Sequence, residues 1–147
     1  MLATRSLGAD TDLPALQRLA ASRYPLLLES SAAGTAQGRW DILLVASGGS
    51  LELARDGTLL RDGVCVDAGG AGDARGGGVG NDFLAALDAQ WQAARLPREE
   101  PRWPFRGGWA LFLAYELAGQ VEPVLALPPA PGRVPVALAL RTMRGFS

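Results

Sequence analysis

Two Asp-Gly pairs within eight residues constrain the fold of this 147-residue chain more than any other feature. Asp56-Gly57 separates an alternating apolar run at 51–55 from a returning run at 58–61, and Asp62-Gly63 leads into 64–66. An Asp-Gly pair between alternating apolar residues is the strongest short-range signal for a β-hairpin. The spacing therefore predicts an antiparallel meander.

Helices are predicted on both sides of the meander. Asp12 precedes Leu13 and Pro14 and is expected to cap a helix that ends before Pro25. Asn81 or Asp82 is expected to cap a second helix that ends near Leu96-Pro97. Apolar residues at helical spacing are expected to face the core: Leu13, Leu16, Leu19 and Ala20 in the first helix, and Phe83, Leu84, Leu87, Trp91 and Ala94 in the second.

Strands are predicted at four further places. A short buried strand is expected at 26–29, and the continuous apolar run in 40–46 fits a strand that is buried on both faces. Two more strands are expected at 107–114 and 136–140, with a short helix at 115–120. The Gly-rich residues 68–80 are expected to form a flexible loop. These elements predict an α+β fold, with a largely antiparallel sheet and two or three helices.

The composition excludes several classes of function. Fourteen basic groups, all Arg, balance 15 acidic groups, so the chain lacks the positive charge that nucleic-acid binding needs. No histidine is present, which removes the commonest general base and metal ligand. The sequence shows no membrane span and no secretory leader, and a cytoplasmic location is the default expectation.

Cys65 is the only cysteine, so it forms no disulfide within the chain. It lies between Val64 and Val66 and is expected to be a small buried core residue. A catalytic thiol would need an activating base that this sequence does not offer.

Two short motifs carry information beyond the fold. The first is Leu26-Leu27-Leu28-Glu29-Ser30, followed after eight residues by Arg39-Trp40-Asp41-Ile42. The second begins with Pro104-Phe105-Arg106-Gly107-Gly108, enters an apolar run that ends in Tyr115-Glu116, and has a further acid at Glu122.

The two motifs, in this order, resemble the LLxS…(S/G)R(F/Y) and PFxGG…Y[DE]…E elements of the amino-terminal domain of chorismate-utilising synthases. The large subunits of aminodeoxychorismate synthase and anthranilate synthase form this family. Asp41-Ile42 after the Arg-aromatic pair favours the aminodeoxychorismate synthase branch. Leu111 and Ala114 stand where the family usually has glycines.

The resemblance spans roughly residues 13–136 and implies that residues 1–147 form an incomplete amino-terminal domain of the anthranilate synthase component I-like fold. It places chorismate, magnesium and the catalytic groups in a carboxy-terminal domain beyond this chain. We therefore expect no catalytic residue, no metal ligand and no cofactor in these 147 residues. Glu116 and Glu122 are expected to be structural or interdomain residues, since paired carboxylates without a base or a metal cluster seldom catalyse.

A tryptophan site is implied by the first motif, and its residues by position are Leu28, Ser30, Gln37, Arg39 and Trp40. Guanidinium, hydroxyl and apolar groups at one rim also suit an amino acid on chemical grounds. The alternative is an ordinary ion pair between Glu29 and Arg39, with Trp40 in the core. Gln37 stands where the family often has an aromatic ring.

The implied activity of the parent enzyme is the amination of chorismate to 4-amino-4-deoxychorismate for folate synthesis. Its implied partners are a glutamine amidotransferase and its own carboxy-terminal domain. Two alternatives stay open: the tryptophan-sensing domain of anthranilate synthase, and a stand-alone amino-acid-binding or interaction module. An uncovered strand edge or apolar face is also expected to make the chain self-associate.

Overall fold

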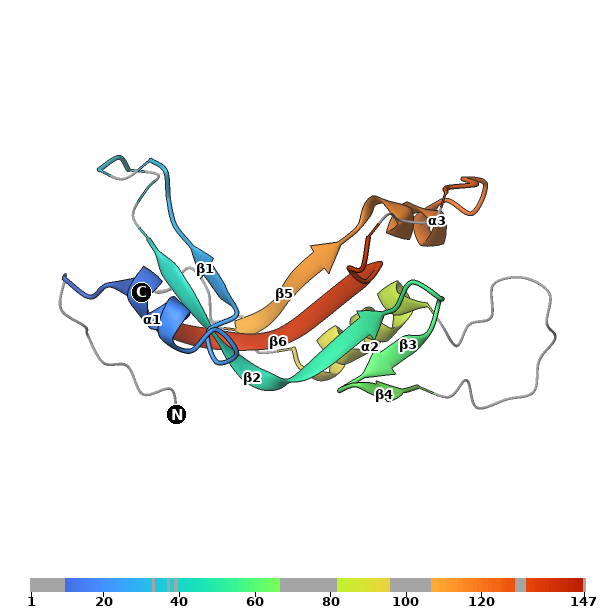
Figure 1. Cartoon of the computed structure of the whole chain (residues 1–147), viewed down its shortest axis with the longest axis horizontal. Coiled ribbons are helices and arrows are strands. Elements are labelled where there is room, and N and C mark those ends of the chain that lie inside the picture. The colour runs from blue at the N-terminus through green and yellow to red at the C-terminus, as the bar shows by residue number, and fades with distance from the viewer. Residues whose placement is uncertain are drawn as a thin grey trace. The chain divides into compact units, whose positions relative to one another are not determined.

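The computed structural model describes residues 10–32, 34–36, 38, 40–66, 82–95, 107–128 and 132–146. These residues form an antiparallel sheet of six strands together with three α-helices and one 3₁₀ helix (Figure 1). The strands are β1 (Leu26–Leu28), β2 (Ile42–Leu53), β3 (Leu59–Arg61), β4 (Val64–Cys65), β5 (Gly107–Leu113) and β6 (Ala137–Phe146). The helices are α1 (Leu13–Leu19), α2 (Phe83–Ala93), η2 (Tyr115–Leu117) and α3 (Ala118–Val121). The predicted α+β class is confirmed.

The strand order is β4-β3-β2-β6-β5, and β1 also pairs with β2. By the density of its internal contacts the chain divides into two units. Unit 1 consists of Met1–Ser47, Glu100–Gly108 and Thr142–Ser147, and unit 2 of Gly48–Glu99 and Trp109–Arg141. The Gly-rich loop predicted at 68–80 lies outside the described residues.

The meander is confirmed, and both Asp-Gly pairs form its turns. β2 pairs antiparallel with β3, with Leu53 opposite Leu59, and β3 pairs antiparallel with β4. At the first turn the Thr58 N–H donates to the Asp56 carboxylate at 2.9 Å. At the second turn Asp62 has a positive φ of 54° and its carboxylate accepts from the Ser50 N–H at 2.6 Å. Carboxylate bonds to nearby amides are what favour Asp in turns.

An aspartate side chain caps the amino-terminal end of α1 and of α2. The Asp12 carboxylate accepts from the Ala15 N–H at 2.8 Å, and the Asp82 carboxylate accepts from the Ala85 N–H at 3.0 Å. Each bond satisfies one of the amides that have no partner in the first turn of a helix. The capping predictions are thus confirmed for Asp12, and for Asp82 rather than Asn81.

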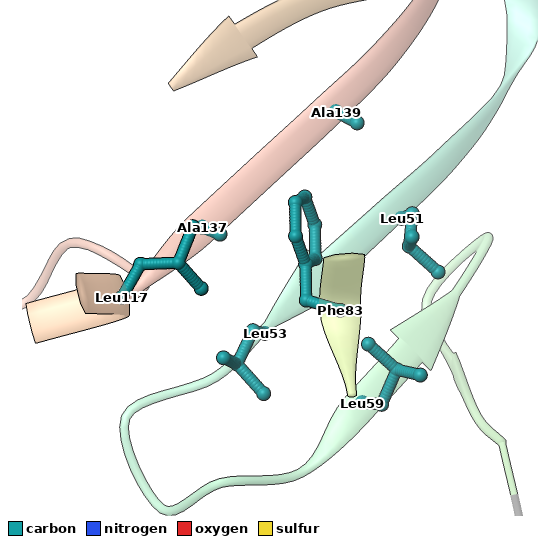
Figure 2. Packing of buried hydrophobic residues seen from close by; sticks show 7 residues of the cluster. All are labelled: Leu51, Leu53, Leu59, Phe83, Leu117, Ala137 and Ala139. Carbon is teal, nitrogen blue, oxygen red and sulfur yellow. The ribbon is translucent and has the colours of Figure 1, made fainter. Parts of the chain in front are cut away.

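The core of unit 2 lies between α2 and one face of the sheet. Its residues alternate along the strands, as residues on one face must. Figure 2 shows the cluster, in which Phe83 of α2 points toward the strands. Two small residues on β6, Ala137 and Ala139, are fully buried and leave space for larger side chains. The buried members are Leu51, Leu53, Leu59, Phe83, Leu117, Ala137 and Ala139.

The strands differ from the prediction in length. Residues 42–46 and 51–53 of the two predicted runs belong to one strand, β2, and Gly48 and Gly49 lie within this strand at positive φ instead of forming a turn. The last strand, predicted at 136–140, continues to Phe146. Consecutive burial of Ile42, Leu43 and Leu44 confirms that this part of β2 is covered on both faces.

Several burial predictions are wrong. Cys65 is exposed, because β4 is only two residues long and lies at the edge of the sheet. Leu19 and Trp91 are exposed although their spacing places them on apolar stripes, and the Arg95 guanidinium lies 5.0 Å from the Trp91 ring. β1 is half-buried to exposed rather than buried, since it pairs with β2 alone among the described strands.

Candidate functional site

The candidate site is the loop that joins β1 to β2, which the first motif predicts. β1 and β2 pair antiparallel in unit 1, with Leu28 directly opposite Ile42. The end of β1 and the start of β2 therefore lie side by side, and their side chains at 28 and 42 share one face of the hairpin. This register brings the two halves of the first motif together.

Asp41 holds the base of this loop. Its carboxylate accepts from the Ser30 N–H at 3.0 Å, which connects the two strand ends across eleven positions of sequence. The bond is charge-assisted, because the acceptor is an ionised carboxylate. Asp41 is exposed, so water also solvates the carboxylate and the bond orders the loop more than it stabilises the fold.

Hydroxyl groups organise the rest of the loop. The Ser30 hydroxyl accepts from the Ala32 N–H at 3.3 Å. The Thr35 hydroxyl donates to the Ala32 carbonyl at 2.7 Å and accepts from the Gly38 N–H at 3.2 Å. Short polar side chains that bond to nearby backbone groups in this way build turns. The described residues of the loop are thus joined by hydrogen bonds between Ser30 and Gly38.

Three of the five predicted ligand residues are described. The Leu28 side chain is 48% exposed and the Trp40 side chain 37% exposed, so each leaves apolar surface open to a ligand at the strand ends. Ser30 is half-buried, and its hydroxyl accepts one described hydrogen bond. A hydroxyl that accepts still has a proton to donate, for example to a carboxylate ligand. Gln37 and Arg39 lie outside the described residues.

The alternative interpretation of this loop places Trp40 in the core. The Trp40 side chain is 37% exposed, which does not fit a fully buried ring. The suggested ion pair between Glu29 and Arg39 involves a residue outside the described part of the chain. Glu29 itself is exposed.

Asp41 and Thr35 are the structural residues of the loop that sequence reasoning missed. Asp41 entered only as a marker of one branch of the family. No local signal in the sequence identifies this role, because the bond joins Asp41 to an amide eleven positions away. Thr35 precedes Gly38 by three residues, a spacing that lets a hydroxyl reach a nearby amide.

The second motif has a distinct backbone. Gly107 and Gly108 begin β5 with φ angles of 147° and 157°, a conformation that residues with a side chain rarely adopt. A Cβ at Gly107 would lie 3.5 Å from the Thr142 carbonyl oxygen, an ordinary contact. Gly107 is therefore required by the backbone conformation and not by a lack of space, and Gly108 shares that conformation.

The acidic residues of the second motif follow β5. Glu116 lies in η2 and is half-buried, whereas Glu122 is exposed and its N–H donates to the Ala118 carbonyl at the end of α3. Buried Leu117 separates them and anchors the segment in the core of unit 2. Within the described ranges, no three acidic, cysteine or histidine side chains gather closely enough to hold a metal ion.

Comparison with known proteins leaves the family open. No family model matches the chain, and no curated protein matches it. None of the described helices combines the length and the apolar character needed to cross a membrane.

Proposed function

We propose that this chain supplies the amino-terminal domain of aminodeoxychorismate synthase component I, a cytoplasmic enzyme that aminates chorismate to 4-amino-4-deoxychorismate. The observation that carries the proposal is the glycine pair of the second motif. Gly107 and Gly108 both have backbone angles that disfavour any other residue, so these two positions of the motif meet a physical demand of the backbone, which supports the proposal. Pro104, Phe105 and Arg106 lie outside the described residues.

The first motif adds support of a different kind. Its two halves are separated by eight residues, and they are joined by the pairing of Leu28 with Ile42 and by the bond from the Ser30 N–H to the Asp41 carboxylate. Of the residues that the resemblance groups into one site, Leu28, Ser30 and Trp40 are described, and they lie at the two ends of the β1–β2 connection, which supports the proposal. Asp41 is also the residue that favours aminodeoxychorismate synthase over anthranilate synthase.

In the proposed enzyme this chain binds and does not catalyse. Magnesium, chorismate and the ammonia delivered by a glutamine amidotransferase belong to the carboxy-terminal domain and its partner. The β1–β2 loop holds tryptophan: Arg39 pairs with the ligand carboxylate, the Ser30 hydroxyl donates a hydrogen bond, and Leu28, Trp40 and Gln37 border the indole ring. An apolar wall with a few convergent polar groups is the usual composition of a small-ligand site.

Two experiments test the proposal. The coding DNA beyond the Ser147 codon should continue in frame into a chorismate-binding domain, and the purified full-length product should form 4-amino-4-deoxychorismate from chorismate, ammonia and magnesium. A stop codon directly after Ser147 would favour a stand-alone module instead. Formation of anthranilate, with inhibition by tryptophan, would identify an anthranilate synthase.

The ligand site has its own test, calorimetry of tryptophan binding to the full-length protein. Removing a guanidinium that pairs with a buried carboxylate typically costs about 2 to 5 kcal/mol, so Arg39→Ala should abolish measurable binding. Arg133→Ala is the matched control, because Arg133 is an exposed arginine in a segment outside this loop and should leave affinity unchanged. Equal affinity of wild type and Arg39→Ala would remove Arg39 from the site.

A further inference from the structure

β5 is the last strand in the sheet order, and its sequence lacks the features that normally protect a sheet edge. Among the described strands it pairs with β6 alone. Its residues, Gly-Gly-Trp-Ala-Leu-Phe-Leu, include no charge and no proline. Natural edge strands are usually blunted by lysine, proline, bulges or a covering loop.

The backbone groups of β5 that face away from β6 can be assigned to alternate residues of the strand. The Ala114 N–H, just after β5, donates to the Val136 carbonyl at 2.9 Å, at the start of β6. Because backbone groups alternate in direction along a strand, Phe112 and Ala110 also direct theirs to β6. The N–H and C=O groups of Trp109, Leu111 and Leu113 therefore point away from β6, to the side of β5 on which no strand of the described residues lies.

Apolar side chains on both faces of β5 are partly exposed beside this edge. Leu111 and Leu113 are 50% and 49% exposed, and Phe112, on the opposite face, is 44% exposed. Trp109 lies on the face that packs against the core. A second β-strand laid along the edge would cover these side chains and satisfy the backbone groups together.

We propose that the partner of this edge is a second copy of the same chain, whose β5 pairs antiparallel with the first about a two-fold axis at Leu111. A two-fold interface requires a surface that is complementary to itself. The strand 109–113 meets that requirement, since it is uncharged and self-pairing brings no like charges opposite each other. The net charge of the whole chain is only −1, so long-range repulsion is weak.

Side-chain sizes select this register. With the axis at Leu111, small Ala110 lies opposite the large Phe112 of the other copy, and Trp109 lies opposite Leu113. An axis at Ala110 would instead oppose two alanines and leave a gap, and an axis at Phe112 would oppose two phenylalanines. Matched large and small residues fill the space between strands without strain.

The dimer is expected to be weak. Standard interfaces bury about 20 to 30 residues on each side, far more than five residues of one strand. The dimer should therefore form at tens to hundreds of micromolar protein and dissociate on dilution, as analytical ultracentrifugation of the 147-residue chain would show. A chain that stays monomeric throughout this concentration range would overturn the proposal.

Disulfide trapping tests the register. In a Cys65→Ser background, Leu111→Cys places two thiols opposite each other at the axis, where the separation of paired strands suits a disulfide. Ala110→Cys is the matched control because it opposes Phe112 and should cross-link at least tenfold more slowly. Efficient cross-linking of Ala110→Cys with none at Leu111→Cys would refute the register.

Charge reversal tests whether the partner is the same strand. Leu111→Lys and Leu111→Glu should each abolish dimerisation, because like charges then meet at the axis, and an equimolar mixture of the two should restore a heterodimer. Val124→Lys, at an exposed apolar residue outside β5, should leave the dimer intact. Circular dichroism of each variant confirms that the fold is kept. Loss of the dimer in Val124→Lys, or no rescue in the mixture, would show that another surface drives association.

Discussion

The glycine pair of β5 shows how a single residue type can be fixed by backbone geometry. Gly107 and Gly108 have φ angles of 147° and 157°, and Gly107 has room for a Cβ. Substitution there is thus opposed by conformational strain and not by steric overlap. Gly119 in α3 offers the contrast, since a Cβ added to it would meet nothing within 4 Å and its backbone is helical.

Gly107→Ala is expected to lower the free energy of unfolding by about 1 to 3 kcal/mol, because alanine must hold an unfavourable φ. Gly119→Ala is expected to be neutral or to stabilise by about 0.4 to 1 kcal/mol, since alanine restricts the unfolded chain at a compatible position. Urea denaturation of both variants measures the difference. Equal effects of the two substitutions would contradict the role given to backbone strain.

The carboxyl pKa of Asp56 is lowered by hydrogen bonds in the first Asp-Gly turn. The Thr58 backbone N–H, with a smaller contribution from the Thr58 side chain, holds the pKa of the Asp56 carboxyl below its ordinary value. A carboxyl whose pKa is lower in the folded state than in the unfolded state stabilises the fold above its unfolded pKa. That contribution is lost as the pH falls through its folded pKa.

We expect an NMR titration to place the Asp56 pKa below that of an unfolded reference peptide. Thr58→Val removes the hydroxyl and keeps the backbone amide, so it should raise the pKa only partly toward the reference value. A full return to the reference value in Thr58→Val would assign the effect to the hydroxyl instead of the amide.

At the scale of elements, α2 is attached to the sheet through one face, and Phe83 is its central contact. The Phe83 side chain is fully buried in the core cluster (Figure 2). Trp91, two turns later, is exposed. Phe83→Ala is expected to cost about 3 to 5 kcal/mol through lost burial and the cavity left behind. Trp91→Ala should cost about 1 kcal/mol or less, since it loses chiefly an exposed contact with Arg95. Thermal and urea unfolding would check the order, and a similar cost for both would refute it.

Elements with strong local signals could be predicted from the sequence. The capped helix starts at Asp12 and Asp82, and the turn at Asp56, depend on bonds between residues two or three positions apart, which a sequence displays directly. The Asp62 carboxylate instead bonds to the Ser50 N–H, twelve positions away. Strand length and burial could not be predicted in the same way. The joining of two runs across Gly48 and Gly49, and the exposure of Cys65, depend on which strands lie alongside, and neighbours distant in sequence decide that.

The candidate site could likewise be predicted only in part. The motif predicted that Leu28, Ser30 and Trp40 would meet at one loop, and the pairing of Leu28 with Ile42 brings the two strand ends together. The motif did not predict that the Asp41 carboxylate accepts a hydrogen bond from the Ser30 N–H, because this bond joins residues eleven positions apart.

At the scale of the whole molecule, burial is distributed unequally. Unit 2 holds the continuous core cluster that joins α2, η2 and three strands, and the buried residues that unit 1 contributes are centred on Ile42, Leu43 and Leu44. Segments with fewer buried apolar contacts open at lower free energy.

Native-state hydrogen exchange should therefore show slower exchange for amides of β3 and α2 than for amides of β1. The Ser30 amide should exchange faster still in Asp41→Ala, which removes its acceptor, and should be largely protected in Asp41→Asn, which keeps an oxygen at that place. Uniform exchange throughout both units would contradict the unequal distribution of stability.

The purified 147-residue chain is expected to form neither 4-amino-4-deoxychorismate nor anthranilate from chorismate with ammonia and magnesium. The chain contains no histidine and no lysine, which deprives it of the commonest proton-transfer groups. Product formation by the pure chain, detected by chromatography, would contradict the non-catalytic role.

The turns at Asp56 and Asp62 also affect the rate of spontaneous aspartate isomerisation in the protein. An Asp-Gly sequence isomerises when the glycine nitrogen attacks the side-chain carboxyl carbon of the aspartate and expels water, which closes a five-membered imide. Water then hydrolyses the imide at its main-chain carbonyl, which leaves isoaspartate. In the folded chain both carboxylates are held elsewhere, by the Thr58 N–H and the Ser50 N–H respectively. The native hairpins should therefore keep a low rate of spontaneous covalent damage at two sequences that are vulnerable in an unfolded chain, and stored samples should accumulate isoaspartate in proportion to the time that these turns spend open.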